Sequence, residues 1–206
     1  MRKIAVSALF LSLAGCGSLF HSSAPAPTTY QLAVDEKPTA APLGADLAVL
    51  ALRVRRGLDN DRLAVLYPDH RLEYLAAARW SGPLDEMLQD LTLQAFWQAG
   101  ALHTVDTDTS AFGSGYWLEI EVADFQAEYK GTRADAAPVI HVHLVGRVGS
   151  AQDRHLLGEF DAEARQPAAD NRLAAMVAAY NQATDTALAR VVAETTDIVR
   201  RNPEKR

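Results

Sequence analysis

Hydrophobic and polar residues alternate along several stretches of the chain with the period of two that is typical of a β-strand. In the clearest stretch, 116–125, the apolar residues that would share one face are Leu118, Ile120 and Val122. Glu119 and Glu121 would share the opposite face. Similar runs follow at 139–148 and 155–162. Together the three runs predict an antiparallel meander with one face exposed to water.

The N-terminal half carries shorter strand patterns. Strands are predicted at 28–34, 47–54 and 102–105, and two further strands at 62–66 and 71–76. Pro68 and Asp69, between the last two runs, suit a type I turn and therefore predict a hairpin. A loop is expected at 36–45, where no apolar period is present.

Two stretches follow instead the 3.6-residue period of an amphipathic helix. Pro83 suits the first position of one helix, and Gly100 suits its C-terminal end. Asp170 or Asn171 would cap a second, longer helix that extends to Ile198. Because strands and helices occupy separate stretches, the predicted fold class is α+β. We expect an antiparallel or mixed β-sheet with two main helices packed on one face, in a single domain.

The first 15 residues have the features of a bacterial signal peptide. An uncharged run at 4–13 follows a cationic start and is too short to cross a membrane, but it suits a signal peptide. The next residues resemble the lipobox of bacterial lipoproteins: Leu13, Ala14, Gly15 and Cys16. We expect a signal peptide at 1–15, a lipidated Cys16 with a flexible tether at 16–27, and an α+β domain at 28–206.

The resemblance to the lipobox also implies a location. Diacylglycerol would be attached to the sulfur of Cys16, and palmitate or a similar acyl chain would complete the anchor. Several acyl chains hold a protein to a membrane far more firmly than one. Position 17 is glycine and not an acidic retention residue. By resemblance, this favours transfer to the outer membrane, with the domain on its periplasmic face.

Charge and cysteine content narrow the classes of partner. The chain has 20 Lys or Arg residues against 26 Asp or Glu residues, and its formal net charge is −6. No long basic run is present, so binding to nucleic acid is not expected. Cys16 is the single cysteine, so the domain cannot form an internal disulfide and must rely on its core for stability.

The chemically reactive side chains form no recognised catalytic motif. His141 and His143 would point to the same side of a strand, as half of a zinc site with Glu119 or Glu121. No third ligand follows at a suitable spacing, so a solvent-exposed strand face is the preferred interpretation. Ser114 lacks the flanking pattern of a nucleophile elbow. We therefore expect no enzymatic activity, no metal and no cofactor apart from the covalent lipid.

Two tryptophans are candidates for a partner-binding surface, because aromatic side chains often anchor interfaces. Trp80 lies at a strand-to-helix junction, and Trp97 lies at the edge of the apolar stripe of the first helix. For both residues, packing in the core or at its rim is the competing and preferred interpretation.

Four features give the chain a family resemblance by their order. They are the lipobox, Thr29-Tyr30-Gln31-Leu32 after the tether, Arg79-Trp80 before the helix at Pro83, and Tyr116-Trp117-Leu118-Glu119-Ile120 before a second strand and a long helix. This order resembles the ABC-type transport auxiliary lipoproteins. Those proteins are found with mammalian-cell-entry (MCE) lipid transport systems and paraquat-inducible operons of Gram-negative bacteria.

The resemblance implies a non-enzymatic accessory role in a trans-envelope lipid transport system, with an MCE-domain protein as the partner. It is compatible with a homo-oligomer, because a conduit partner suits a ring. A lipoprotein that scaffolds or regulates envelope assembly, such as a cell-wall synthase activator, suits the tether and the domain equally well. An enzyme acting on envelope lipids or glycans is the least favoured alternative.

Overall fold

The sheet is organised around its longest strand, β7 (Tyr116–Glu128), in a computed structural model that describes residues 26–35, 42–110, 113–131 and 136–203. The other strands are β1 (Thr28–Tyr30), β2 (Leu43–Val49), β3 (Arg53–Val54), β4 (Arg62–Leu66), β5 (Leu72–Trp80), β6 (Leu102–Thr107), β8 (Val139–Ser150) and β9 (Leu156–Pro167). The helices are α1 (Leu84–Ala99) and α2 (Leu173–Arg201). The predicted signal peptide and the lipobox lie outside the described residues.

Strand β7 has different neighbours on its two sides. On one side, β8 runs antiparallel to it over its whole length, and β9 continues the sheet beyond β8. On the other side, three short strands follow one another along β7, and β2, β3 and β4 all run parallel to it. Beyond these, β6 is parallel to β2, β5 is antiparallel to β4, and β1 is parallel to β5. The predicted α+β class with a mixed sheet is confirmed.

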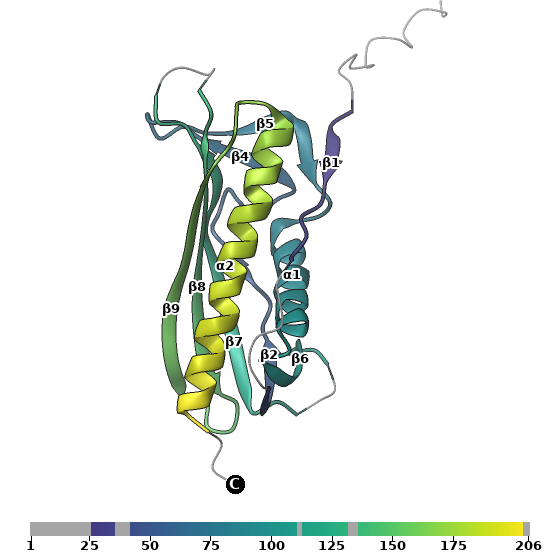
Figure 1. Ribbon diagram of the computed structural model, residues 1–206, viewed down its shortest axis with the longest axis vertical. Coiled ribbons are helices and arrows are strands. Elements are labelled where there is room, and N and C mark those ends of the chain that lie inside the picture. The colour runs from purple at the N-terminus through teal and green to yellow at the C-terminus, as the bar shows by residue number, and fades with distance from the viewer. Residues whose placement is uncertain (1–25, 36–41, 111–112, 132–135, 204–206) are drawn as a thin grey trace, which may run out of the picture.

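Both helices lie on the same face of this sheet, as predicted (Figure 1). α2 packs along β8 and β9, and α1 lies between α2 and β6. The side chains of β7 that face the helices are fully buried: Leu118, Ile120 and Val122. On β8, Ile140, Val142 and Leu144 are buried in the same way. The alternation in the sequence therefore identified the buried face of the meander correctly.

A β-bulge at Ala123 changes the face that each residue of β7 presents. The pairing with β8 shifts its register between Val122 and Asp124. Even-numbered residues face the helices before the bulge and odd-numbered residues face them after it, so Phe125 enters the core. This bulge interrupts the alternation at 116–125, which had predicted one regular strand.

The helix ends agree only in part with the prediction. Gly100 ends α1 with φ 59°, in the left-handed region that favours glycine, and its N–H donates to the carbonyl of Phe96. The predicted cap of α2 is wrong. Arg172 occupies the N-cap position and no side chain caps the helix, while the Asp170 carboxylate accepts a hydrogen bond from the Arg172 N–H.

Two strand predictions also need correction. The run at 47–54 is divided into β2 and β3, and β2 begins at Leu43, inside the segment predicted as a loop. The predicted strand at 28–34 is regular only over β1. Beyond β1, the N–H of Ala33 donates to the side chain of Asn181 on α2, 2.8 Å away, so this segment is held by the helix and not by the sheet.

Candidate functional site

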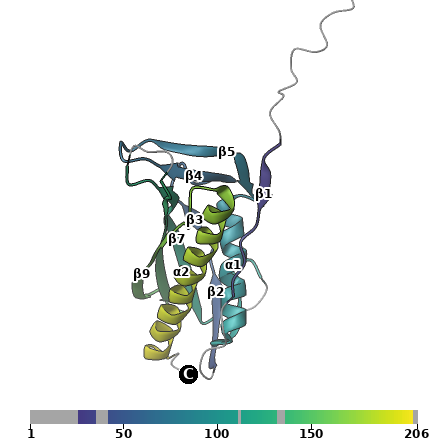
Figure 2. The ribbon, with the colours of Figure 1, turned by 45° about the horizontal axis from the view of Figure 1, so that its top comes forward.

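The domain has two ends that α2 separates. β1, β4 and β5 lie at the end where α2 begins, so the predicted tether joins the domain there (Figures 1 and 2). At the other end, the Tyr116 hydroxyl donates to the carbonyl of Asn202, 2.7 Å away, and ties the start of β7 to the end of α2. The 29 residues of α2 span roughly 43 Å at about 1.5 Å per residue. We call these the anchor end and the distal end.

The two tryptophans proposed for a partner surface have opposite environments. Trp80 is 2% exposed and makes edge-to-face contacts with Phe125 and Tyr180 in the core. Its assignment to a partner surface is therefore wrong, because a partner could reach it only if the core opened. Trp97 is 59% exposed, and its indole N–H donates to the carbonyl of Val105 on β6, 2.8 Å away. A partner contact through Trp97 stays a prediction.

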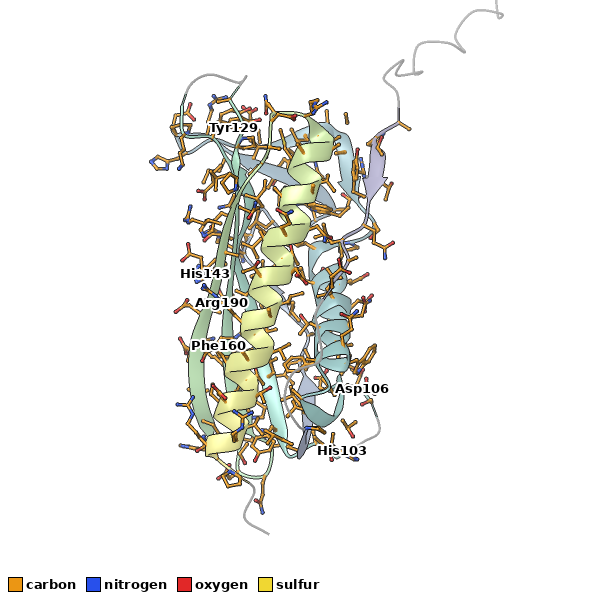
Figure 3. The ribbon with its side chains drawn as sticks, viewed as in Figure 1. His103, Asp106, Tyr129, His143, Phe160 and Arg190 are labelled. Carbon is orange, nitrogen blue, oxygen red and sulfur yellow. The ribbon has the colours of Figure 1, made fainter. Side chains whose placement is uncertain are left out.

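Polar side chains cover the face of β7, β8 and β9 that points away from the helices. His141 is 6% exposed, and its two ring nitrogens lie 2.8 Å from Glu128 Oε1 and 2.9 Å from Glu163 Oε1. Arg165 donates to the same two carboxylates, at 2.8 and 2.9 Å. His143 lies 2.6 Å from Asp161 on the same face (Figure 3). This set of charged contacts joins the three strands across their outer surface.

The contacts shift the acidity of both carboxyl groups around His141. Desolvation alone would raise the pKa of Glu128, but hydrogen bonds from His141, Gln126 and Arg165 outweigh it and hold that pKa below its usual value. The pKa of Glu163 is also lowered, chiefly by the hydrogen bond from Arg165. Both groups are therefore held in the ionised form, and both accept hydrogen bonds.

The histidine pair does not form the zinc site considered from the sequence. Glu119 lies opposite Arg147 on β8, and Glu121 lies opposite Val145, so neither is next to His141 or His143. Among the residues that the structure describes, no group of three or more His, Cys, Asp or Glu side chains is arranged to hold a metal ion. The ring nitrogens of His141 instead face carboxylates on the two neighbouring strands.

The same outer face carries an open groove near the distal end. Its volume is about 520 Å³, within the range of small-ligand sites. The groove is lined by residues at the end of β2 and just after it (Ala48, Leu50), at the end of β6 and just after it (Thr107, Asp108), before and on β7 (Ser114, Trp117, Glu119), and between β8 and β9 (Ala151, Arg154). Four separate segments of the chain therefore meet at this groove.

This groove and its lining were not predicted from the sequence. Ser114 was considered only as a nucleophile, and Trp117 only as part of a family motif. One signal was present: Trp117 interrupts the polar side of the alternating run, where Glu119 and Glu121 follow it. A large aromatic residue on the wet face of a strand indicates a surface with a role beyond solvation. The residues of the other segments are brought there only by the sheet order.

The fold defines a class: a single α+β domain with a mixed sheet, one face covered by two helices and the other face polar. The chain belongs to the ABC-type transport auxiliary lipoprotein component family, whose model matches residues 30–193. A comparison with curated proteins finds no match. Within the described part of the chain, no helix is both long and apolar enough to cross a membrane.

Solved structures share this fold. The crystal structure of protein XCC0632 from Xanthomonas campestris superposes with a TM-score of 0.76 at 24% identity, covering 85% of this chain and 98% of that one. An uncharacterized protein has a TM-score of 0.64 at 16% identity, covering 82% and 99%. The hypothetical protein CT253 from Chlamydia trachomatis has a TM-score of 0.55 at 11% identity, covering 78% and 100%. These similarities establish the fold alone.

Proposed function

We propose that this protein is a non-enzymatic accessory lipoprotein of an ABC-type, MCE-linked lipid transport system. Lipid on Cys16 would anchor it to the periplasmic face of the outer membrane, and its domain would dock onto the MCE-domain protein. The observation that carries the proposal is the family match, which covers nearly all of the predicted domain.

The geometry of the domain suits such an adaptor. The predicted tether at 16–27 extends at most about 40 Å when fully stretched. It enters the domain at the anchor end, so the distal end is presented away from the membrane by the length of α2. A partner that reaches across the periplasm would then meet the distal end first.

Site-directed photo-crosslinking in cells tests the proposal and the orientation together. A photoreactive residue replaces Arg201, which is exposed at the distal end, or Leu72, which is 39% exposed at the anchor end. We expect the position 201 probe to capture an MCE-domain protein and the position 72 probe to capture none. Failure of both probes to capture an MCE protein would contradict the partner assignment, and capture of a cell-wall synthase instead would favour the envelope-assembly alternative.

A further inference from the structure

The floor of the distal groove is a flat indole ring. Trp117 lies opposite Ala48 on β2 and opposite Gly149 on β8, so both cross-strand neighbours are small. A Cβ atom on Gly149 would lie only 2.0 Å from Cζ2 of Trp117, which shows that the ring lies directly over the glycine backbone. The indole N–H donates to the carbonyl of Ser150, 3.1 Å away, and restrains the ring against β8.

The walls of the groove are polar and carry both signs of charge. Asp108 and Glu119 contribute carboxylates, and Arg154 contributes a guanidinium. Glu119 is paired with Arg53 of β3 at the groove margin. Carboxylates only accept hydrogen bonds, and a guanidinium only donates them. The groove therefore offers donors and acceptors around an aromatic floor.

We propose that this groove binds an oligosaccharide, with one pyranose ring stacked on Trp117. A pyranose has a flat face of C–H groups, which packs on an indole, and a rim of hydroxyl groups. Each hydroxyl both donates and accepts, so it matches a carboxylate on one wall and a guanidinium on the other. The volume of about 520 Å³ is large enough for a short oligosaccharide.

Two other classes of ligand fit the groove less well. A nucleic acid would bring phosphates against Asp108 and Glu119, where like charges repel. A protein interface usually has few carboxylates near its buried centre, whereas here two carboxylates flank the aromatic floor. The proposal does not depend on the transport role, because it rests only on the groove.

Binding is tested on the full mature, lipidated chain in a detergent without a sugar headgroup. The probes are the tetramer of N-acetylglucosamine, which represents cell-wall glycan, and the tetramer of glucose, which represents neutral glycan. We expect saturable binding of at least one probe by calorimetry and saturation-transfer NMR. Selectivity between the probes identifies the source of the sugar, and absence of saturable binding of both probes at millimolar concentration overturns the proposal.

Variants locate the binding. Trp117→Ala should weaken binding about tenfold, the order expected for loss of one stacked ring. Leu72→Ala is the control, because it removes an exposed apolar side chain at the anchor end, which lines no part of the groove, and it should leave affinity unchanged. Arg154→Ala should weaken saccharide binding and leave Trp117 in place. If Trp117→Ala fails to fold, the affinity of Arg154→Ala shows whether the saccharide binds in this groove. Unchanged saccharide affinity in Trp117→Ala together with lost crosslinking to a protein would show that the groove is a protein contact and that the proposal is wrong.

Discussion

His141 is nearly buried on the polar outer face of the sheet, next to the buried Gln126 of β7. Both of its ring nitrogens lie within 3 Å of carboxylate oxygens, on Glu128 and Glu163. Arg165 contacts the same two carboxylates, so the pair of negative charges is matched by neighbouring donors. The sequence predicted the face correctly but not the burial, because the burial depends on which charged residues β7 and β9 bring beside the ring.

These contacts make stability depend on pH in the acid range. The folded-state pKa of Glu128 is lowered, so its contribution to stability is fully present above the unfolded-state pKa, near the usual value of 4.5. That contribution is lost as the pH falls from there through the folded-state value. We expect the free energy of unfolding, measured with urea because a denaturant salt would screen the ion pairs, to fall as the pH drops below about 4.5.

Replacing the carboxyl group isolates its part of the pH dependence. Glu128→Gln should have a smaller loss of stability over this acid range than the unmodified chain. Glu194→Gln serves as a control, because it removes an exposed carboxyl group from α2, and it should keep the acid dependence of the unmodified chain. An identical acid dependence in Glu128→Gln and the unmodified chain would show that the contact does not control stability.

Glycine at position 146 is required by the close approach of an aromatic ring. A Cβ atom there would lie 2.2 Å from Cζ of Phe160, which is buried beneath α2. We expect Gly146→Ala to lower the free energy of unfolding in urea by about 1–3 kcal/mol through overpacking. Gly44 has no atom within 4 Å of such a Cβ. Gly44→Ala should change stability by less than about 1 kcal/mol, and equal losses in both variants would contradict the packing argument.

Among the elements, β6 is held at its outer edge by a side chain from α1. The indole N–H of Trp97 donates to the carbonyl of Val105. Because this carbonyl already accepts a hydrogen bond, it is less available for pairing with a further strand at the edge of β6. Arg190 of α2 does the same for β9, where its guanidinium donates to the carbonyl of Glu163 (Figure 3). Both helices therefore cover edges of the sheet as well as its face.

The edge contact of Trp97 has a measurable energy. Trp97→Phe keeps an aromatic ring but removes the N–H donor, so we expect a loss of about 0.5–1.5 kcal/mol in the free energy of unfolding. Amide hydrogen exchange should also become faster in β6 and stay unchanged in β8, which has strands on both sides. Faster exchange in both strands would show a general destabilisation and contradict a local role.

The elements were predictable where one face of a strand or helix is buried. α1 was located from its period and its flanking Pro83 and Gly100, and β7 from its alternation. The bulge had a signal that was overlooked: Val122 and Phe125 are both apolar but differ in parity, which a regular strand cannot bury on one face. β2 begins early because it pairs with β6, and pairing over such a distance leaves no local pattern.

At the scale of the whole molecule, the α+β fold class could be predicted from the sequence, but the order of the strands in the sheet could not. The strands β2, β3 and β4 lie one after another along β7. This arrangement could not be derived from the sequence, because each of them pairs with residues of β7 that are more than 60 positions later in the chain. The groove shares this limit, since its lining comes from four segments. The tether, in contrast, is a purely local feature of composition.

The separation of anchor end and distal end predicts that lipid and fold are independent. Cys16→Ser should leave the thermal unfolding midpoint of the domain unchanged, because residue 16 precedes the matched domain. The variant should also bind its partner in solution. In cells it should move from the membrane fraction to the soluble periplasm, with loss of function in a lipid transport or envelope-integrity assay. Full activity of the unlipidated protein would show that the lipid serves only to target the protein to the membrane and is not needed for its function.

The succession of short strands along β7 also means that β2, β3 and β4 cannot complete their pairing until β7 is available. If the chain crosses a membrane from its N-terminus, β2, β3 and β4 emerge well before β7, the strand with which they pair. The hydroxyl of Tyr180 donates to the carbonyl of Ala64, 116 positions earlier, so the core closes only after most of α2 has emerged. Lipid would therefore be attached to Cys16 while the domain behind it is still unfolded, and the final helix, the last part to arrive, completes the fold.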